Sequence, residues 1–509
     1  IHSIIKSVMN VMNIKRIAAA ISCSLMTVVA HAAVLPATQT DSQWFKDSAA
    51  NVATKAQLET KKTAKNVILF VGDGMSISTL TAARILQGQQ QTGNQGGEEN
   101  FLSFEQFPHT ALVKTYNTNQ QTPDSAGTMT AMATGVKTKA GIISISDTSL
   151  RGNCLSSKGN ELVSLVDLAN AKGLSTGIVT TARLTHATPA ATYAKSPERD
   201  WEGDFNLPAE AVANGCTDIA SQLVMRDEAN SLSVALGGGR SYFLPKEVTD
   251  GENKAGKRKD GKDLTKAWVE NFSKAAYVWD KKGFDAIDVA NTDHLLGLFN
   301  PSHMEYEADR ADDVGGEPSL SEMTAKSLEI LKKNDKGFLL IVESGRIDHG
   351  HHAGNANRAL TDAVELSNAV KAAVDATSSD DTLIMVTADH SHVFTIAGYP
   401  KRGNPILGLV HDVDGSLALA NDGKPYTTLA YTNGPGAVVG VRDDLTSVDT
   451  QDKDFMQQAL IPMESETHAG EDISLHAMGP GSNLVQGVIE QNVIFHIINQ
   501  AQQLGGTKY

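Results

Sequence analysis

The sequence predicts an α/β fold in which helices sandwich a central, largely parallel β-sheet. Short apolar runs alternate along the chain with helical patterns, and each run ends in polar or glycine-rich sequence. Such alternation is typical of a sheet that is covered by helices on both faces. Of the 509 residues, 41% are hydrophobic and 20% are charged, which is the balance of a globular protein with a large core.

The apolar runs are the predicted strands. The first covers residues 66–71 and is broken by Gly72-Asp73-Gly74, a sequence that favours a turn. Short runs bounded by turn signals are typical of buried parallel strands. The other runs cover 175–181, 232–236, 338–342 and 382–387.

Helical patterns lie between these runs. Apolar residues recur at three- and four-residue spacing, as expected for helices that turn one face toward a core. The first pattern of this kind begins near Ser78. The others cover 161–172, 319–333 and 358–376.

The first 32 residues are predicted to be a secretory signal peptide. Lys15 and Arg16 precede the apolar run 17–30, which leads into a small-residue cleavage pattern at 30–32. The run is shorter than the ~20 residues that a membrane helix needs, and no later stretch reaches that length without charges or turn formers. We therefore expect no membrane span. The alternative is a lipoprotein acylated at Cys23, which the short apolar stretch before this residue disfavours.

The remaining chain, residues 33–509, is acidic. The signal carries three basic and no acidic residues, so its removal changes the formal net charge from -15 to -18. This charge opposes nonspecific binding to nucleic acid or anionic membranes. Cys154 and Cys216 remain as an even pair in a chain addressed to an oxidising compartment, and we expect one disulfide. The expected location is secreted, periplasmic or extracellular.

Residues 33–509 are predicted to form one catalytic domain with insertions. The stretch 246–262 is rich in glycine, lysine and aspartate and reads as a solvated loop. Residues 391–467 are richer in glycine and proline and have weaker periodicity. We expect this second stretch to form a smaller inserted subdomain.

Acidic and imidazole side chains follow the predicted strands. Asp73, Glu343 and the pair Asp389-His390 all fall where a strand ends. In open α/β sheets, functional sites gather at the carboxyl ends of the strands, so we expect these groups to meet. The glycines beside Asp73 let the backbone approach a ligand or an ion closely. For the segments of Asp73 and of Asp389-His390, each taken alone, a turn is the alternative reading.

The densest chemical signal is the segment 342–355, VESGRIDHGHHAGN. Asp348 and His352 are four residues apart, which places them on one face of a helix, although Gly350 is equally compatible with a turn. Carboxylate and imidazole ligands together suit zinc. The alternative is a surface histidine cluster with adventitious metal affinity.

Ser125 lies at the expected start of a helix that contains residues 128–133. The dipole and the free amides at a helix N-terminus favour an anion, such as phosphate. A serine in this place is more often only a helix N-cap, and that reading stays open.

The segments 71–75, 122–135, 342–355 and 387–394 together resemble the alkaline phosphatase family, and the resemblance runs from about Asn66 to near Gln502. It implies metal-dependent hydrolysis of phosphate monoesters to alcohol and inorganic phosphate. The nucleophile would be Ser125, which would pass through a phosphoserine.

The family's site residues carry over to this chain position by position. The resemblance implies two Zn²⁺ and one Mg²⁺ per subunit, with Arg199 clamping the phosphate. It places one zinc on Asp348, His352 and His468, the other on Asp73, Asp389, His390 and the Ser125 oxygen, and magnesium on Asp73, Thr188 and Glu343.

The chain departs from the best-known enterobacterial enzymes of this family. His186 and His349 stand where those enzymes carry Asp and Lys near the phosphate and the third metal, whereas animal enzymes share the His pair. The strength of magnesium binding stays open, and we expect faster release of phosphate. The pair Cys154 and Cys216 matches a disulfide of the animal branch, and a homodimer is implied as well. No calcium site is predicted, because Asn300 stands where an acid is expected.

Two other functions remain open at this point. One is another hydrolase of the same metal-hydrolase superfamily, such as a phosphodiesterase, although residues 124–128 lack the Cys/Ser-x-Pro-x-Arg context of a sulfatase. The other is a noncatalytic secreted protein that binds metal or phosphate. Retention of Ser125 and Arg199 favours hydrolysis of monoesters.

Overall fold

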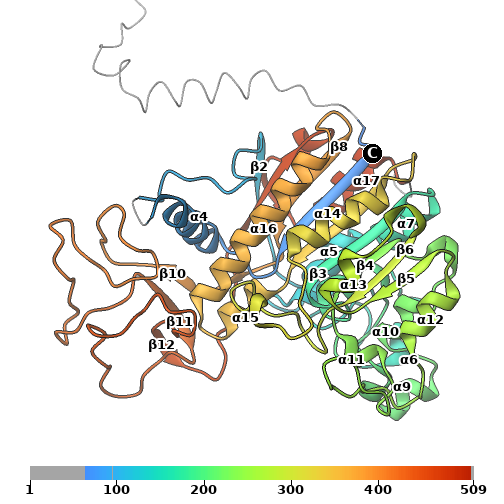
Figure 1. Cartoon of the computed structure of the whole chain (residues 1–509), viewed down its shortest axis with the longest axis horizontal. Coiled ribbons are helices and arrows are strands. Elements are labelled where there is room, and N and C mark those ends of the chain that lie inside the picture. The colour runs from blue at the N-terminus through green and yellow to red at the C-terminus, as the bar shows by residue number, and fades with distance from the viewer. Residues whose placement is uncertain (1–62, 94–95, 506–509) are drawn as a thin grey trace, which may run out of the picture. The chain divides into compact units, whose positions relative to one another are not determined.

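A ten-stranded sheet forms the centre of the residues that the computed structural model describes, 63–93 and 96–505 (Figure 1). Its order is β15-β2-β14-β8-β1-β7-β3-β4-β6-β5, and within this sheet only β14 runs antiparallel to its neighbours. The predicted largely parallel sheet is confirmed. Its strands are β1 (Asn66–Gly72), β2 (His109–Lys114), β3 (Ser175–Arg183), β4 (Val234–Gly238), β5 (Ala275–Val278), β6 (His294–Leu298), β7 (Phe338–Ser344), β8 (Thr382–Ala388), β14 (Ile473–Met478) and β15 (Gly487–Glu490).

Strand β1 lies in the middle of the sheet, between β7 and β8. All its residues are buried, as expected for an apolar strand that is covered on both faces. Its last residue, Gly72, pairs with Ser344 of β7 and with Ala388 of β8. The three strands therefore end at the same level. This register brings the polar residues at their carboxyl ends to one edge of the sheet.

Helices cover both faces of the sheet (Figure 1). Helices α14 and α16 pack on one face, and α5, α7, α8 and α17 pack on the other, so the predicted sandwich is confirmed. The helices are α4 (Ile77–Thr92), α5 (Ser125–Thr134), α6 (Cys154–Ser157), α7 (Leu165–Ala171), α8 (Ala187–Tyr193), α9 (Ala209–Ala213), α10 (Ile219–Val224), α11 (Arg240–Phe243), α12 (Leu264–Asn271), α13 (Lys281–Asp285), α14 (Leu320–Leu331), α15 (Arg346–His352), α16 (Ala356–Ala376) and α17 (Val493–Gln502).

One predicted helix boundary is wrong. The helix expected over 161–172 begins only at Leu165, because Glu161 pairs with Ile145 in a short β-bridge. Ser164 then caps the helix, and it exchanges hydrogen bonds with Asp167 in a capping box. The helices expected over 319–333 and 358–376 are present as α14 and α16, with ends that differ by a few residues.

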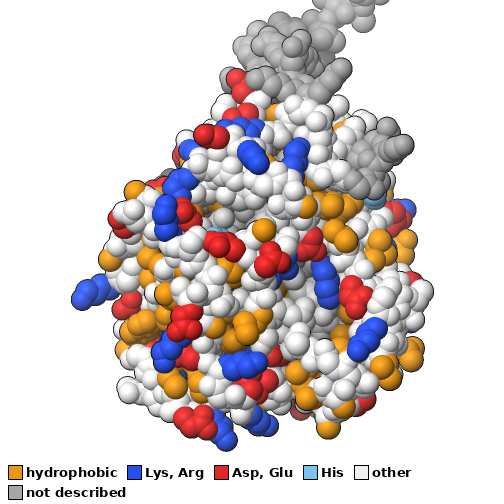
Figure 2. All heavy atoms as spheres, turned by 90° about the vertical axis from the view of Figure 1, so that its right-hand side faces the viewer, with side chains coloured by type: hydrophobic (Ala, Val, Ile, Leu, Met, Phe, Trp, Pro, Cys, Tyr) orange, Lys and Arg blue, Asp and Glu red, His pale blue; other side chains and the backbone are white. Residues whose placement is uncertain are grey.

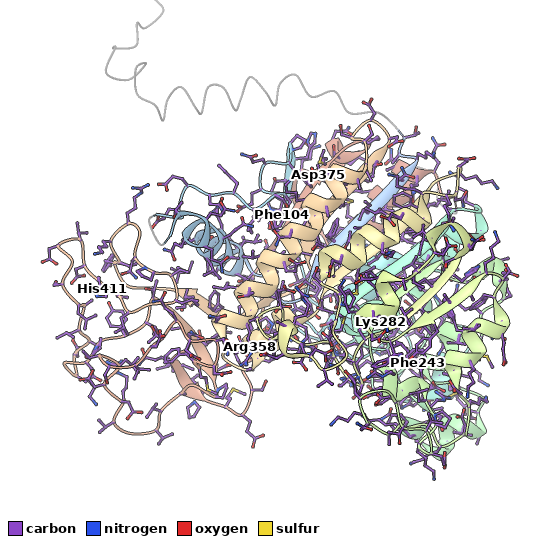
Figure 3. The ribbon with its side chains drawn as sticks, viewed as in Figure 1. Phe104, Phe243, Lys282, Arg358, Asp375 and His411 are labelled. Carbon is purple, nitrogen blue, oxygen red and sulfur yellow. A yellow bond between two sulfur atoms is a disulfide. The ribbon has the colours of Figure 1, made fainter. Side chains whose placement is uncertain are left out.

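A smaller sheet lies within residues 391–467, on the opposite side of α16 from Phe243; His411 marks this part of the chain in Figure 3. Its strands are β10 (Phe394–Ile396), β11 (Leu429–Gly434) and β12 (Ala459–Pro462). The chain leaves and re-enters the main fold through a short antiparallel pair, β9 (Ser391–His392) and β13 (His468–Ala469). This pairing places His468 opposite His392, although 76 positions of sequence separate them.

The prediction that 246–262 is a solvated loop is wrong for Arg258. Its side chain is fully buried, with Nη1 3.0 Å from Asp218 Oδ1 and Nη2 2.7 Å from Asp260 Oδ2. Arg258 therefore fastens the loop to helix α10. The ion pair with Asp218, which lies 40 positions away in the sequence, cannot be inferred from local composition.

We expect Arg258→Ala to destabilise the fold by about 3–5 kcal/mol, because the buried Asp218 carboxylate loses its counter-ion and keeps only its hydrogen bonds from Ser221. Denaturant unfolding measures the change. Lys262→Ala is the matched control, since the exposed Lys262 amine lies 3.8 Å from Asp260, and its loss should cost less than about 1 kcal/mol. Equal effects of the two variants would refute a structural role for the buried pair.

The predicted disulfide between Cys154 and Cys216 is present.

On the face shown in Figure 2, acidic and basic side chains are interspersed rather than segregated by charge. Among residues 63–93 and 96–505, no helix combines the length and the apolar character needed to cross a bilayer. The predicted signal peptide, residues 1–32, and Cys23 lie outside the described residues.

Candidate active site

The chemistry predicted from sequence gathers at the carboxyl edge of the central sheet. Asp73 follows β1, Glu343 belongs to β7, and Asp389 and His390 follow β8. All four side chains are fully buried. Burying several carboxylates together costs free energy unless they are paired or hold a metal ion.

Ser125 is the first residue of α5, and it faces a buried group made by Asp73, Asp389 and His390. The ligand atoms of these three residues lie within 4.8 Å of one another. The Ser125 hydroxyl lies 3.0 Å from His390 Nε2 and 3.4 Å from Asp73 Oδ1. The N-cap of α5 is Asp124, whose side chain accepts the Gly127 N–H, so the reading of Ser125 as only an N-cap is wrong.

This group has the electrostatics of a cation site. Burial raises the pKa of Asp73 well above its usual range, and repulsion from Asp389 raises it further. Asp73 Oδ2 and His390 Nδ1 are buried and have no hydrogen-bond partner among the described residues. Unsatisfied buried groups of this kind are rare, and a bound ion would satisfy the carboxylate.

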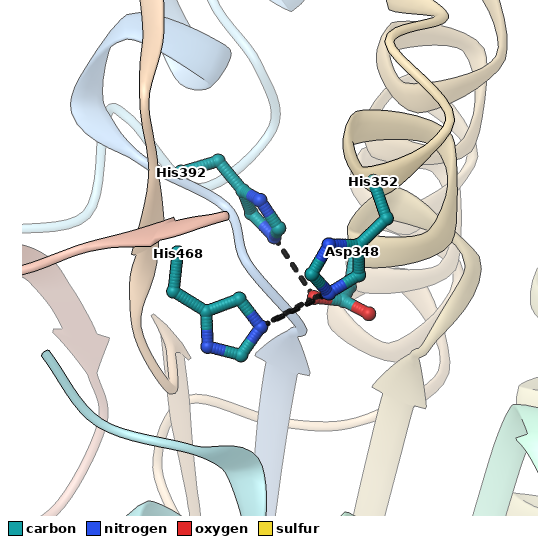
Figure 4. A group of neighbouring side chains, drawn as sticks. All are labelled: Asp348, His352, His392 and His468. Atoms are coloured by element: carbon teal, nitrogen blue, oxygen red, sulfur yellow. Dashed lines mark hydrogen bonds and ion pairs between the residues drawn. The ribbon is translucent and has the colours of Figure 1, made fainter. Parts of the chain in front are cut away.

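A second group surrounds Asp348 (Figure 4). Asp348 Oδ1 lies 3.3 Å from His352 Nε2, 2.8 Å from His392 Nε2 and 3.3 Å from His468 Nε2. Helix α15 places Asp348 and His352 one turn apart on one face, so the helical alternative for this segment is correct. Burial opposes ionisation of Asp348, but the three imidazoles lower its pKa well below its usual range.

His392 was missed by the sequence prediction. It is fully buried, and its Nδ1 lies 2.5 Å from Glu466 Oε2 while its Nε2 contacts Asp348. Burial opposes its charge, but hydrogen bonds to the two carboxylates raise its pKa to about 10. Because both ring nitrogens contact carboxylates, His392 orients Asp348 rather than competing for a metal. Its position two residues after His390 was the signal available in the sequence.

We expect His392→Ala to weaken metal binding at the Asp348 group by about 10–100-fold, because the carboxylate loses the partner that orients it. Titration of the metal-free protein with Zn²⁺ measures the change. His411→Ala is the matched control, since this half-buried histidine lies in the inserted region and its ring hydrogen-bonds to the backbone carbonyl of Leu409 rather than to a carboxylate. Unchanged affinity in His392→Ala would contradict the orienting role.

A third set of oxygens lies between β7 and α8. Glu343 Oε2 accepts a hydrogen bond from the Thr180 hydroxyl, and burial raises the pKa of Glu343 to about 7. Glu343 Oε1 and Thr188 Oγ1 are buried and have no hydrogen-bond partner among residues 63–93 and 96–505. Together with Asp73 Oδ2, they are hard oxygen ligands of the kind that Mg²⁺ prefers.

Arg199 lies beside the start of α5. Its Nη1 is 3.1 Å from Asp124 Oδ2, and its Nη2 is 3.2 Å from His186 Nε2. Asp124 is largely buried, which opposes its charge, but Arg199 lowers its pKa. Asp124 thus caps the helix and holds the guanidinium next to Ser125. The predicted phosphate clamp and the predicted nucleophile are brought together.

His186 and His349 lie close together, as the sequence comparison implied, but a third histidine joins them. His303 lies 4.1 Å from His349 and 5.2 Å from His186 between ring centroids. The sequence prediction missed His303, because it stands alone in a loop after β6 without any motif spacing. Only the fold brings it to the site.

The parallel sheet and the ligand groups at its carboxyl edge define an α/β protein of the metal-dependent hydrolase class. The family model for alkaline phosphatase matches residues 64–504, and the chain belongs to that family. The chain is 46% identical to the tissue-nonspecific alkaline phosphatase isozyme of Gallus gallus over 95% of this chain and 93% of that protein. It is 44% identical to the isozyme of the same name from Homo sapiens, over 93% and 90%.

Solved structures confirm the fold. Alkaline phosphatase from the Antarctic bacterium TAB5 superposes with a TM-score of 0.60 at 23% identity, covering 87% of this chain and all of that one. The Thermus thermophilus enzyme gives a TM-score of 0.61 at 24% identity, covering 93% of this chain and 96% of that one.

Proposed function

We propose that this protein is an alkaline phosphatase, which hydrolyses phosphate monoesters to alcohol and inorganic phosphate through a phosphoserine on Ser125. The observation that carries the proposal is the position of the Ser125 hydroxyl. It lies within 3.4 Å of Asp73 and His390, at a helix N-terminus, beside Arg199. A nucleophile, a cation site and a phosphate clamp thus meet at one point.

The proposed cofactors are two Zn²⁺ and one Mg²⁺ per subunit. The unsatisfied buried oxygens and the two carboxylate–imidazole groups fit these ions. When bound, such ions neutralise phosphate charge and lower the pKa of hydroxyl groups. One zinc would be held by Asp348, His352 and His468, the other by Asp73, Asp389, His390 and Ser125, and magnesium by Asp73, Thr188 and Glu343.

The residues of the chain position the phosphate for in-line attack. Arg199 can hold two phosphate oxygens through its planar guanidinium, and the free amides at the start of α5 favour the same anion. The Ser125 hydroxyl gives up its proton, and its oxygen attacks phosphorus while the bond to the alcohol oxygen breaks; the departing oxygen takes up a proton to give the alcohol. Water then cleaves the phosphoserine, and the serine regains its proton as phosphate leaves.

Activity toward three substrates tests this proposal. The protein should hydrolyse p-nitrophenyl phosphate in preference to bis-p-nitrophenyl phosphate and p-nitrophenyl sulfate, most strongly at alkaline pH. Preference for the diester or the sulfate would assign the chain to another activity of the same superfamily. Absence of all three activities in the zinc- and magnesium-loaded protein would favour a noncatalytic binding protein.

Location and assembly remain proposals as well. The predicted signal peptide and the disulfide between Cys154 and Cys216 support a secreted, periplasmic or extracellular protein. We also propose a homodimer, with the inserted subdomain at 391–467 as a candidate interface. Its strand β12 exposes Leu460 and Ile461. Sedimentation of the purified protein measures the oligomeric state.

A further inference from the structure

A buried glutamine that the proposed mechanism does not use contacts the turn that carries two of the candidate zinc ligands. Gln491 is the residue after β15, and its side chain is fully buried. Its Nε2 lies 2.7 Å from the backbone carbonyl oxygen of Asp389. A carbonyl only accepts hydrogen bonds, so the amide of Gln491 is the donor. The contact therefore falls on the peptide group that joins Asp389 to His390.

This contact connects the edge of the central sheet to its middle. Strand β15 is an edge strand, and β2 and β14 lie between it and β8. Gln491 and Asp389 are 102 positions apart in the sequence. Helix α17, which begins at Val493, packs against α5 and β1. The chain thus turns from the sheet edge toward the nucleophile helix, and Gln491 lies in that turn.

The residue before Gln491 fastens the segment to the strand and the loop beside it. Glu490 pairs with Lys114 of β2 at 2.9 Å and with Lys137, which follows α5, at 3.0 Å. The Lys137 side chain is largely buried, so this ion pair is screened less than one in free solvent. Gln491 is therefore anchored on its amino-terminal side.

The residue after Gln491 fastens the segment to the nucleophile helix itself. Asn492 Nδ2 donates a hydrogen bond to the backbone carbonyl of Gly135 at 3.0 Å. Gly135 is the C-cap of α5, the helix whose first residue is Ser125. The segment 490–492 therefore joins α5 to the turn after β8, and Gln491 is the member of the segment that contacts this turn.

Gln491 complements the groups that orient the Asp389 carboxylate. Asp389 Oδ1 accepts the backbone N–H of Gly74 at 3.0 Å and that of His390 at 2.9 Å. The Thr128 hydroxyl lies 3.3 Å from Asp389 Oδ2. These contacts hold the side chain, whereas Gln491 holds the backbone on which Asp389 and His390 are both mounted. A rotation of this peptide group would move both side chains.

We infer that Gln491 is a positioning residue that sets the orientation of Asp389 and His390 toward Ser125. The inference rests on the proposed function, because these three residues are candidate ligands of one zinc in that proposal. Gln491 contacts neither the substrate nor the reacting atoms and acts through the backbone. Hydrogen-bonding partners that orient metal ligands change metal affinity or activity by about 10–100-fold when they are lost.

The variant Gln491→Met tests the inference, because it keeps an unbranched side chain and removes the donor. Titration of the metal-free protein with Zn²⁺ should show about tenfold weaker binding at the group of Asp73, Asp389 and His390, and unchanged binding at the Asp348 group. At saturating zinc, kcat for p-nitrophenyl phosphate should be about tenfold lower. KM should not change, because Arg199 and the amides of α5 still bind the phosphate.

Gln502→Met is the matched control. Gln502 is a buried glutamine of α17 whose Nε2 donates to the backbone carbonyls of Phe338 at 2.8 Å and Lys65 at 3.2 Å, at the amino ends of β7 and β1. The Oε1 atoms of Gln491 and Gln502 are both buried and have no hydrogen-bond partner among the residues that the structure describes. Both variants should lower the melting temperature, but Gln502→Met should leave zinc affinity and kcat unchanged.

Unchanged zinc affinity and kcat in Gln491→Met, or equal losses in the two variants, would overturn the positioning role. Gln491→Asn serves if Gln491→Met does not fold, because it keeps the amide but is one methylene too short to reach Asp389. It should show the same losses, and unchanged values would again overturn the inference. Failure of the unmodified enzyme to hydrolyse p-nitrophenyl phosphate would instead overturn the proposed function, while the zinc titrations would still decide the role of Gln491.

Discussion

Ser125→Ala should lower kcat for hydrolysis of p-nitrophenyl phosphate by roughly 10⁴-fold or more. Loss of the nucleophile has an effect of this size in other hydrolases. The Ser125 oxygen is the nucleophile of the proposed mechanism, and the structure offers no second hydroxyl in the same relation to both Asp73 and His390 among the described residues. Zinc binding should persist, because the carboxylate and imidazole ligands remain. Steady-state kinetics and metal analysis measure the two effects.

Ser319→Ala is the control for this variant. Ser319 also stands at the start of a helix, where it caps α14, and it belongs to none of the ligand groups. Its loss should cost about 1 kcal/mol of stability, as for other N-caps, and leave kcat unchanged. If Ser125→Ala retained substantial monoesterase activity with its metal bound, the phosphoserine mechanism would be wrong.

Removal of metal should abolish activity and also lower the thermal stability of the protein. Asp73, Glu343 and Asp389 are fully buried, and burial raises the pKa of each above its ordinary value. Without a cation, these carboxylates must be protonated or repel one another. Ions that bind only the folded state stabilise it by mass action, by about 4 kcal/mol at a thousandfold excess over Kd.

Chelation followed by calorimetry and assay measures both effects. Zinc alone should restore most of the activity, and magnesium together with zinc should restore the rest, because the two carboxylate–imidazole groups suit zinc and the oxygen set suits magnesium. Full activity in protein that elemental analysis finds free of zinc would contradict the assignment of the ligands. An unchanged melting temperature after chelation would contradict the role of the ions in compensating the buried charge.

Much of the fold was predictable because its signals are local. The apolar run at 66–71 and the turn after it predicted β1 and the position of Asp73, and the spacing of apolar residues over 319–333 predicted α14. Strands with weaker signals were missed. The half-exposed strand β2 and the antiparallel β14 belong to the sheet through pairing with distant partners, which no local pattern records.

The residues of the site likewise fall into those that the sequence predicted and those that it did not. The residues on which the family resemblance rests, from Asp73 to His468, occupy the carboxyl edge of the sheet or the segments that pack against it. Those that lack a recognisable spacing were missed, as His303 was, or read wrongly, as Arg258 was. Arg258 lies in a stretch whose composition is typical of a solvated loop. Its side chain is nevertheless fully buried, because Asp218 and Asp260 form ion pairs with its guanidinium.

The sequence by itself determined the fold class, the family and the identity of the groups at the catalytic edge, because strand and helix patterns and motif spacing are set by neighbouring residues. Tertiary structure alone decided how those groups are oriented. His392 holds Asp348 only because β9 pairs with β13, and His303 reaches His186 and His349 only because the loop after β6 folds back against Arg183. Such contacts join residues that are far apart in the chain. Their energies depend on packing and burial, which arise only when the whole chain has folded.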